Sequence, residues 1–110
     1  MIDFFIKYQE QIEQLSAKYH VAELSAFGSV LNSNFTQNSD IDLLVKFDKK
    51  GLKPEEIGEL YWILNDELEL LFKRKVDLIV KKTFRNPIFQ QDVDKTKQII
   101  YVRKNKKISG

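Results

Sequence analysis

The chain contains no cysteine among its 110 residues, and it has no long apolar run. The absence of cysteine excludes a disulfide framework and a thiolate metal site. No apolar stretch approaches the roughly 20 residues that a membrane-spanning helix requires. The start of the chain also lacks the basic residues and the small-residue cleavage site of a signal peptide. We therefore expect a cytoplasmic protein that does not associate with membranes.

The sequence also has little net charge, because 18 lysine and arginine residues face 16 aspartate and glutamate residues, which gives +2. An excess of this size does not by itself indicate nucleic-acid binding, and we expect no direct contact with nucleic acid. The basic residues gather at positions 73–75, 81–82 and 103–107. These runs are either solvated surface and tail, or a surface that meets phosphates or an acidic partner.

Length and pattern predict a single domain over residues 1–102, followed by a basic tail over residues 103–110. Apolar residues at steps of three and four predict an amphipathic helix over residues 3–19 and a second helix over residues 54–72. A short helix is predicted over residues 86–94. Runs of apolar residues predict strands at residues 21–27, 40–47, 76–80 and 98–102.

Turn-forming residues predict a loop over residues 32–39, and residues 29–31 before it suit a short helical turn. The order of the elements predicts an α/β (α+β) fold, with a small mixed sheet of about four strands and helices packed on one side.

Two aspartates, Asp40 and Asp42, interrupt the apolar strand predicted at residues 40–47. Residues i and i+2 of a strand point to the same face, so both carboxylates are expected at one place. Asp77 interrupts the strand at residues 76–80 in the same way. Three carboxylates that converge in a poorly solvated site repel one another unless cations neutralise them. Magnesium prefers such oxygen ligands, and a pair of magnesium ions is the usual arrangement for phosphoryl chemistry.

Each of these residues also has a purely structural explanation when it is taken alone. Asp40 follows Ser39 and could form a local hydrogen bond in a turn. Asp77 could be a residue at the edge of the sheet, and a Gly-Ser pair such as Gly28 and Ser29 is common in turns. Asp42 is harder to explain structurally, because apolar residues flank it. The combination of these residues in one order and spacing is what points to a functional site.

That combination resembles a known signature. Gly28 and Ser29, ten intervening residues, and the run at residues 39–45 resemble the motif of the polymerase-β-type nucleotidyltransferase superfamily, in particular its minimal single-domain branch, the MNT proteins. Asp77 lies where that family keeps a third carboxylate, and residues 86–101 resemble its closing helix and strand. The resemblance covers most of residues 20–102, and it implies a polymerase-β-like nucleotidyltransferase core.

The resemblance also implies roles for individual residues. Asp40, Asp42 and Asp77 would be catalytic and would bind two magnesium ions, with Asp77 also helping to deprotonate the attacking hydroxyl. Gly28 would let the backbone approach the nucleotide phosphates, and Ser29 would donate its hydroxyl and N–H to the triphosphate. The substrate implied is ATP, from which AMP is transferred to a hydroxyl while pyrophosphate leaves.

One position departs from the family pattern. Many relatives have an arginine and a glycine shortly after the Gly-Ser pair, where this chain has Asn32 and Ser33. Asparagine carries no charge with which to bind a phosphate bidentately, so turnover or nucleotide preference is in question. Lys46, Lys73 and Arg74 are candidates to replace the missing charge.

The acceptor of the nucleotide is expected to come from a partner, because a chain of this length leaves no room for a further acceptor-binding domain. The resemblance implies an antitoxin of a type VII-like pair that transfers AMP to a tyrosine of a HEPN-domain ribonuclease toxin. Two alternatives remain open: a nucleotidyltransferase acting on an aminoglycoside-like small molecule, and a non-catalytic antitoxin that acts by binding alone. A homo- or hetero-oligomer is compatible with each, and Trp62 could be a partner contact.

Overall fold

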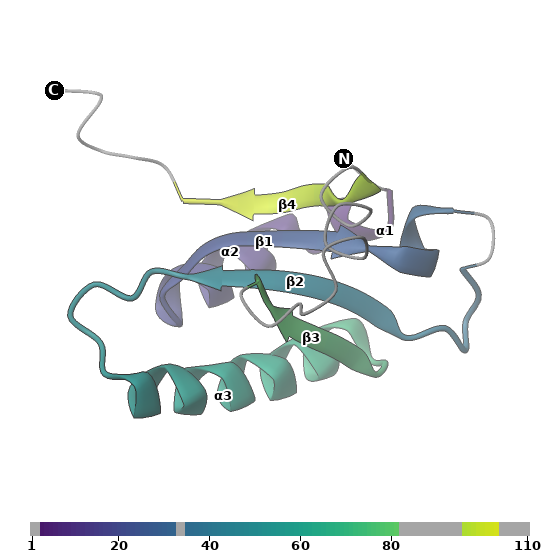
Figure 1. Cartoon of the computed structure of the whole chain (residues 1–110). Coiled ribbons are helices and arrows are strands. Elements are labelled where there is room, and N and C mark those ends of the chain that lie inside the picture. Colours follow the sequence, from purple (N-terminus) through teal and green to yellow (C-terminus); the bar gives the residue numbers. More distant parts are fainter. Residues whose placement is uncertain (1–2, 33–34, 82–95, 104–110) are drawn as a thin grey trace, which may run out of the picture.

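The computed structural model describes residues 3–32, 35–81 and 96–103, which form a mixed β-sheet with helices on one face (Figure 1). The strands, in order along the chain, are β1 (Val21–Phe27), β2 (Ile41–Phe47), β3 (Val76–Val80) and β4 (Gln98–Val102). In the sheet they lie in the order β3-β2-β1-β4. β1 is antiparallel to both β2 and β4, whereas β2 and β3 run parallel. This arrangement confirms the predicted fold class.

The N-terminal helical region is divided into α1 (Asp3–Ile6) and α2 (Gln9–Lys18). The prediction of one continuous helix over residues 3–19 is therefore wrong. The backbone leaves helical geometry at Tyr8, with φ −105° and ψ 7°, and the ring of Tyr8 packs edge-on against that of Phe72, with centroids 5.1 Å apart. Edge-to-face aromatic packing is favourable, and here it outweighs the local helical preference of the sequence.

The long helix α3 (Pro54–Phe72) begins and ends where the sequence predicts. Pro54 occupies its first position, where a missing N–H needs no partner. Glu56 reaches back and accepts a hydrogen bond of 2.9 Å from the backbone N–H of Lys53, which fixes the entry into the helix. The helix ends at Lys73, whose backbone is left-handed with φ 57°.

A single hydrophobic core fills the space between the helices and the face of the sheet that they cover. The large side chains of this core that are completely buried are Phe5, Ile12, Leu24, Ile41, Leu43, Leu64, Leu68 and Ile100. The strand β3 contributes Val76 and Leu78, which are almost completely buried. α2 packs against β1 and β4, and α3 packs against β3 (Figure 1). The apolar face that the sequence predicts for α3 is buried in this core through Leu64 and Leu68. Its Trp62 points outward, with 65% of its surface exposed.

The remaining predictions differ little from the structure. β1, β3 and β4 have the predicted bounds, and the short 3₁₀ helix η1 (Gly28–Leu31) forms the predicted helical turn. β2 begins at Ile41, one residue later than predicted. The helix predicted over residues 86–94 lies outside the described residues. Within the part of the chain that is described, no helix is long and apolar enough to cross a membrane.

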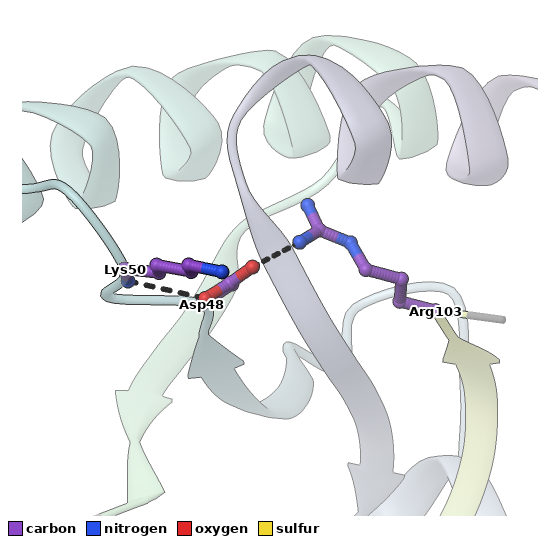
Figure 2. Close-up of polar contacts among 3 residues, drawn as sticks. All are labelled: Asp48, Lys50 and Arg103. Carbon is purple, nitrogen blue, oxygen red and sulfur yellow. Dashed lines mark hydrogen bonds and ion pairs between the residues drawn. The ribbon is translucent and has the colours of Figure 1, made fainter. Parts of the chain in front are cut away.

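Polar contacts fix the end of β2 that lies away from Asp40 and Asp42 (Figure 2). Asp48, directly after β2, accepts a hydrogen bond of 3.1 Å from the backbone N–H of Lys50 and forms an ion pair with Arg103. Arg103 follows β4, and its backbone N–H bonds to the carbonyl of Ala22 in β1 at 2.8 Å. These contacts tie three neighbouring strands together at one end of the sheet.

Candidate functional site

The parallel pairing of β2 with β3 brings two of the predicted carboxylates together. In this register Asp42 lies directly opposite Asp77, and the next pair along, Leu43 and Leu78, is buried in the core. Because successive side chains of a strand point to opposite faces, both carboxylates lie on the face of the sheet that the helices leave open. Asp42 is half-buried and Asp77 is exposed. The convergence expected from the sequence requires these two strands to be neighbours, and in the sheet they are.

Asp40 lies just before β2, and its side chain is exposed. The strand argument that placed it beside Asp42 therefore does not apply directly, because ladder pairing begins only at Ile41. The backbone N–H of Ile41 bonds to the carbonyl of Lys75 at 3.0 Å. The negative charge of Asp40 nevertheless acts on Asp42, so the three predicted carboxylates share one electrostatic environment.

Burial and like charge both act on Asp42. Burial raises the pKa of its carboxyl above the usual value, and the negative charges of Asp77 and Asp40 raise it further. The burial has a clear source, because Phe27 is the register partner of Asp42 in β1 and packs with Leu44 in a small apolar cluster. A carboxyl in this position holds a proton more readily than an exposed one, and a nearby cation would reverse that preference.

Gly28 completes the site from the β1 side. It directly follows β1, and its backbone has φ +76°, a conformation that L side chains rarely adopt. A Cβ atom at this position would collide with Oδ2 of Asp42 and would lie 3.3 Å from its Cγ. A side chain here would therefore displace the Asp42 carboxylate. Ser29 follows, half-buried in η1, and its carbonyl accepts a hydrogen bond of 3.0 Å from the N–H of Asn32.

The donor set fits a divalent cation by its chemistry. Among residues 3–32, 35–81 and 96–103, no three histidine, aspartate or glutamate side chains are already close enough to enclose an ion together. Asp42 and Asp77 are instead register partners on one face of the sheet, and burial together with the charges of Asp77 and Asp40 raises the pKa of Asp42. Carboxylate oxygens with an excess of negative charge are the ligands that magnesium prefers.

The three candidates for the missing family arginine have different positions. Lys73 is exposed at the end of α3, where its backbone ends the helix. Lys46 is exposed and lies on the same open face as Asp42, four residues further along β2. Arg74 donates hydrogen bonds to two backbone carbonyls of the loop before β2. Its guanidinium is thus already engaged with the protein.

The sequence did not indicate the part that two residues, Phe27 and Arg74, play in the structure of this site. Phe27 is the apolar neighbour that helps to bury Asp42, and its position directly before Gly28 is the available signal. Arg74 holds the loop that leads to Asp40, but no local pattern connects it with residues more than thirty positions earlier.

Comparison with known proteins places this geometry in a family. The sequence matches the family described as "Nucleotidyltransferase domain" over residues 8–107, which is most of the chain. The chain belongs to this nucleotidyltransferase domain family. The resemblance drawn from the Gly-Ser and aspartate spacing is confirmed.

Two relatives of this nucleotidyltransferase domain carry more specific names. "Putative protein adenylyltransferase MJ1379" of Methanocaldococcus jannaschii is 36% identical over 88 residues, which cover 80% of this chain and 83% of the relative. "Protein adenylyltransferase MntA" of Thermococcus cleftensis is 29% identical over 92 residues, covering 82% of this chain and 83% of that protein.

Solved structures share the fold. A toxin–antitoxin complex crystallised with AMP-PNP contains a chain that matches with a TM-score of 0.65 and 20% identity, covering 87% of this chain and 74% of that one. The structure of a tri-AMPylated Shewanella oneidensis HEPN toxin in complex with an MNT antitoxin contains a chain that matches with a TM-score of 0.58 and 18% identity, covering 86% of this chain and 70% of that one. At these identities the likeness shows the fold alone.

Proposed function

We propose that this nucleotidyltransferase domain is a magnesium-dependent protein adenylyltransferase. Its proposed reaction transfers AMP from ATP to a hydroxyl of a partner protein, namely a tyrosine of a HEPN-domain toxin, and so acts as the antitoxin of a cytoplasmic toxin–antitoxin pair. The observation that carries the proposal is the alignment of Asp42 with Asp77 across β2 and β3, with Gly28 directly against Asp42. The names of the relatives and the AMPylated toxin in a related complex support the choice of acceptor.

Asp40, Asp42 and Asp77 are the residues that would hold the magnesium ions. When bound, the ions supply positive charge that offsets the charge of the reacting phosphates. The chain's own residues contribute position and proton transfer. Gly28 lets the backbone lie directly against the Asp42 carboxylate, because the Cβ of any side chain there would collide with Oδ2 of Asp42. Ser29, at the start of η1, offers a hydroxyl and an N–H to a phosphate oxygen, and Asp77 accepts the proton of the attacking hydroxyl.

The raised pKa of Asp42 gives cation binding a characteristic signature. Burial, Asp77 and Asp40 favour the protonated form of this carboxyl in the free protein. Since a carboxylate must be deprotonated to ligate a metal, ion uptake should release protons in the pH range where Asp42 is protonated in the free protein. Calorimetry of magnesium binding in buffers of different ionisation enthalpy measures this release, and Asp42→Asn should abolish its pH dependence.

The direct test is to incubate the protein with ATP, magnesium and a candidate HEPN-domain partner, followed by intact mass measurement. We expect the partner to gain one or more AMP units. Asp40→Ala and Asp42→Asn should abolish the gain, while Asp66→Asn, an exposed carboxyl on α3, should leave it unchanged. An unmodified partner in the presence of folded, nucleotide-binding protein would contradict the proposed activity.

One observation favours a second candidate function, neutralisation of the partner by binding alone. Asn32 and Ser33 stand where many family members have arginine and glycine, and Arg74 is engaged elsewhere. A site without that arginine has less charge with which to hold a triphosphate. Under the binding model, Asp42→Asn should neutralise the partner as well as the unaltered protein does. Under the catalytic model, neutralisation should be lost together with AMP transfer.

A further inference from the structure

We infer that Arg74 is a positioning residue, which fixes the backbone on one side of Asp40 and so sets where this carboxylate lies relative to Asp77. The inference rests on the proposed function, because it treats Asp40 as a ligand of the proposed magnesium site. Arg74 lies in the short connection between α3 and β3, whereas Asp40 lies just before β2.

The first observation is a pair of hydrogen bonds from one guanidinium nitrogen. Nη1 of Arg74 donates to the carbonyl oxygen of Thr36 at 3.0 Å and to that of Ser39 at 2.9 Å. Ser39 directly precedes Asp40. Hydrogen bonds from a charged donor are stronger than neutral ones, so Arg74 holds both ends of the turn over residues 36–39.

The turn itself is already closed by its own contacts. The backbone N–H of Thr36 bonds to Oγ of Ser39 at 2.9 Å, and the N–H of Ser39 bonds to the carbonyl of Thr36 at 3.1 Å. The N–H of Asn38 also bonds to Oγ1 of Thr36, at 3.3 Å. These contacts give the turn a defined shape, but they do not attach it to the sheet. Arg74 attaches the turn to the connection that leads into β3.

Two aromatic rings hold the guanidinium in place. Its central carbon lies 4.6 Å from the ring centroid of Phe35 and 5.2 Å from that of Phe4. The two rings also contact each other edge-on, with centroids 5.4 Å apart. A planar guanidinium can stack on aromatic faces and donate to two carbonyls at once, which the single ammonium of lysine does less well.

The residue after Arg74 secures the other side of Asp40. The carbonyl of Lys75 accepts the hydrogen bond of 3.0 Å from the N–H of Ile41, where the pairing of β2 with β3 begins. Residues 74–75 therefore hold the peptide units before and after Asp40. The same two residues lead into β3, which carries Asp77. One short segment thus fixes the relative position of two proposed ligands that are far apart in the sequence.

The test compares two arginines that hold opposite ends of β2. Arg74→Met removes the contacts before β2, and Arg103→Met removes the ion pair with Asp48 after β2. We expect Arg74→Met to weaken binding of magnesium with a non-hydrolysable ATP analogue by about tenfold, as is typical for residues that orient metal ligands. Arg103→Met should bind as the unaltered protein does. Calorimetry measures both affinities.

Hydrogen exchange gives a readout that does not depend on ligand. The amides of residues 36–41 should exchange faster in Arg74→Met, and Arg74→Lys should restore part of the protection and part of the affinity. If Arg74→Met does not fold, the same two measurements on Arg74→Lys test the inference. Unchanged affinity in the Arg74 variants, or an equal loss in Arg103→Met, would overturn the inference. Failure of the unaltered protein to bind magnesium and nucleotide would instead overturn the proposed function on which it rests.

Discussion

Asp42 combines features that ordinary folding would not favour. It is half-buried beside Phe27, it faces Asp77, and it lies within reach of the charge of Asp40. Each of these features raises the pKa of its carboxyl and makes the ionised form costly. A protein that needed only a stable sheet would have an apolar or amide side chain here. The acidic residue is therefore better explained by a cation than by packing.

This cost predicts a stability difference for Asp42→Asn. The folded-state pKa is raised, so ionisation removes stability as the pH rises from the unfolded pKa through the folded one. Without divalent ions, Asp42→Asn should raise Tm at pH 7 by about 2–4 °C. The gain should vanish at pH 3, where both side chains are uncharged. Thermal melts across this pH range measure it.

Asp66→Asn is the control for the loss of a negative charge, because Asp66 is exposed on α3. Added magnesium should raise the Tm of the unaltered protein and leave that of Asp42→Asn nearly unchanged. If Asp42→Asn were less stable than the unaltered protein at pH 7, the ionised Asp42 carboxylate would not be costly to the fold, and this interpretation would be wrong.

Alanine variants of Gly28 and Gly51 separate two effects of adding a side chain, the collision with Asp42 and the strain of a left-handed backbone. Their φ values are nearly equal, +76° and +77°, but only at Gly28 would a Cβ meet the Asp42 carboxylate. Gly28→Ala and Gly51→Ala should each lose about 1–2 kcal/mol of stability from the left-handed backbone. Only Gly28→Ala should also weaken binding of magnesium with nucleotide, and chemical denaturation with calorimetry separates the two effects. Equal binding by both variants would show that the collision is relieved harmlessly.

Among the helices and strands, α3 shows most clearly what the sequence predicts well. Its start at Pro54 and its apolar stripe are local signals, and both are confirmed. The break between α1 and α2 could not be predicted in this way, because it depends on contacts between Tyr8 and Phe72, which are far apart in the sequence. Short-range patterns give the elements, whereas long-range aromatic packing decides where one of them stops.

The same distinction holds for the candidate site. Asp42 and Asp77 each interrupt an apolar strand, so the sequence indicated both residues, whereas the pairing of their strands is seen only in the fold. The role of Arg74 was not predicted, because its partners Thr36 and Ser39 lie in a turn that carries no sign of the contact. The sequence identifies the acidic groups, and only the fold shows what holds them.

The end of α3 offers a prediction about the helix itself. Lys73 has φ 57°, a left-handed conformation that glycine adopts without strain. Lys73→Gly should therefore raise the free energy of unfolding by about 0.5–1 kcal/mol. Lys18→Gly, at the last residue of α2, should instead lower it by a similar amount, because glycine is unfavourable within a helix. Urea denaturation of both variants checks the opposite signs.

Across the whole molecule, the two ends of β2 have opposite electrostatic character. Near the start of the strand the negative charges of Asp77 and Asp40 act on Asp42, and at its other end Asp48 is held by Lys50 and Arg103 (Figure 2). The hydrogen bond from the Lys50 backbone and the charge of Arg103 lower the pKa of Asp48, while partial desolvation opposes them. Ionisation of Asp48 therefore stabilises the fold, whereas ionisation of Asp42 destabilises it.

Asp48→Asn should consequently behave in the opposite way to Asp42→Asn. Because the folded pKa of Asp48 is lowered, its contribution is present above the unfolded pKa and is lost as the pH falls through the folded one. Asp48→Asn should lower Tm slightly at pH 7, by about 1–3 °C, and should match the unaltered protein near pH 2. Thermal melts in low salt measure the difference. A Tm difference that stays constant with pH would indicate lost packing instead of lost charge.

The parallel register of β2 and β3 also limits how the gene can change. Only residues 73–75 separate α3 from β3. An inserted residue that shifted the register of β3 by one position would turn every side chain of this strand to the opposite face, with Asp77 toward the hydrophobic interior and Leu78 toward water. A change in the length of this connection would then separate Asp42 from Asp77 although neither aspartate is substituted. In descendants of this chain, that three-residue spacing should be as intolerant of insertion and deletion as the carboxylates are of substitution.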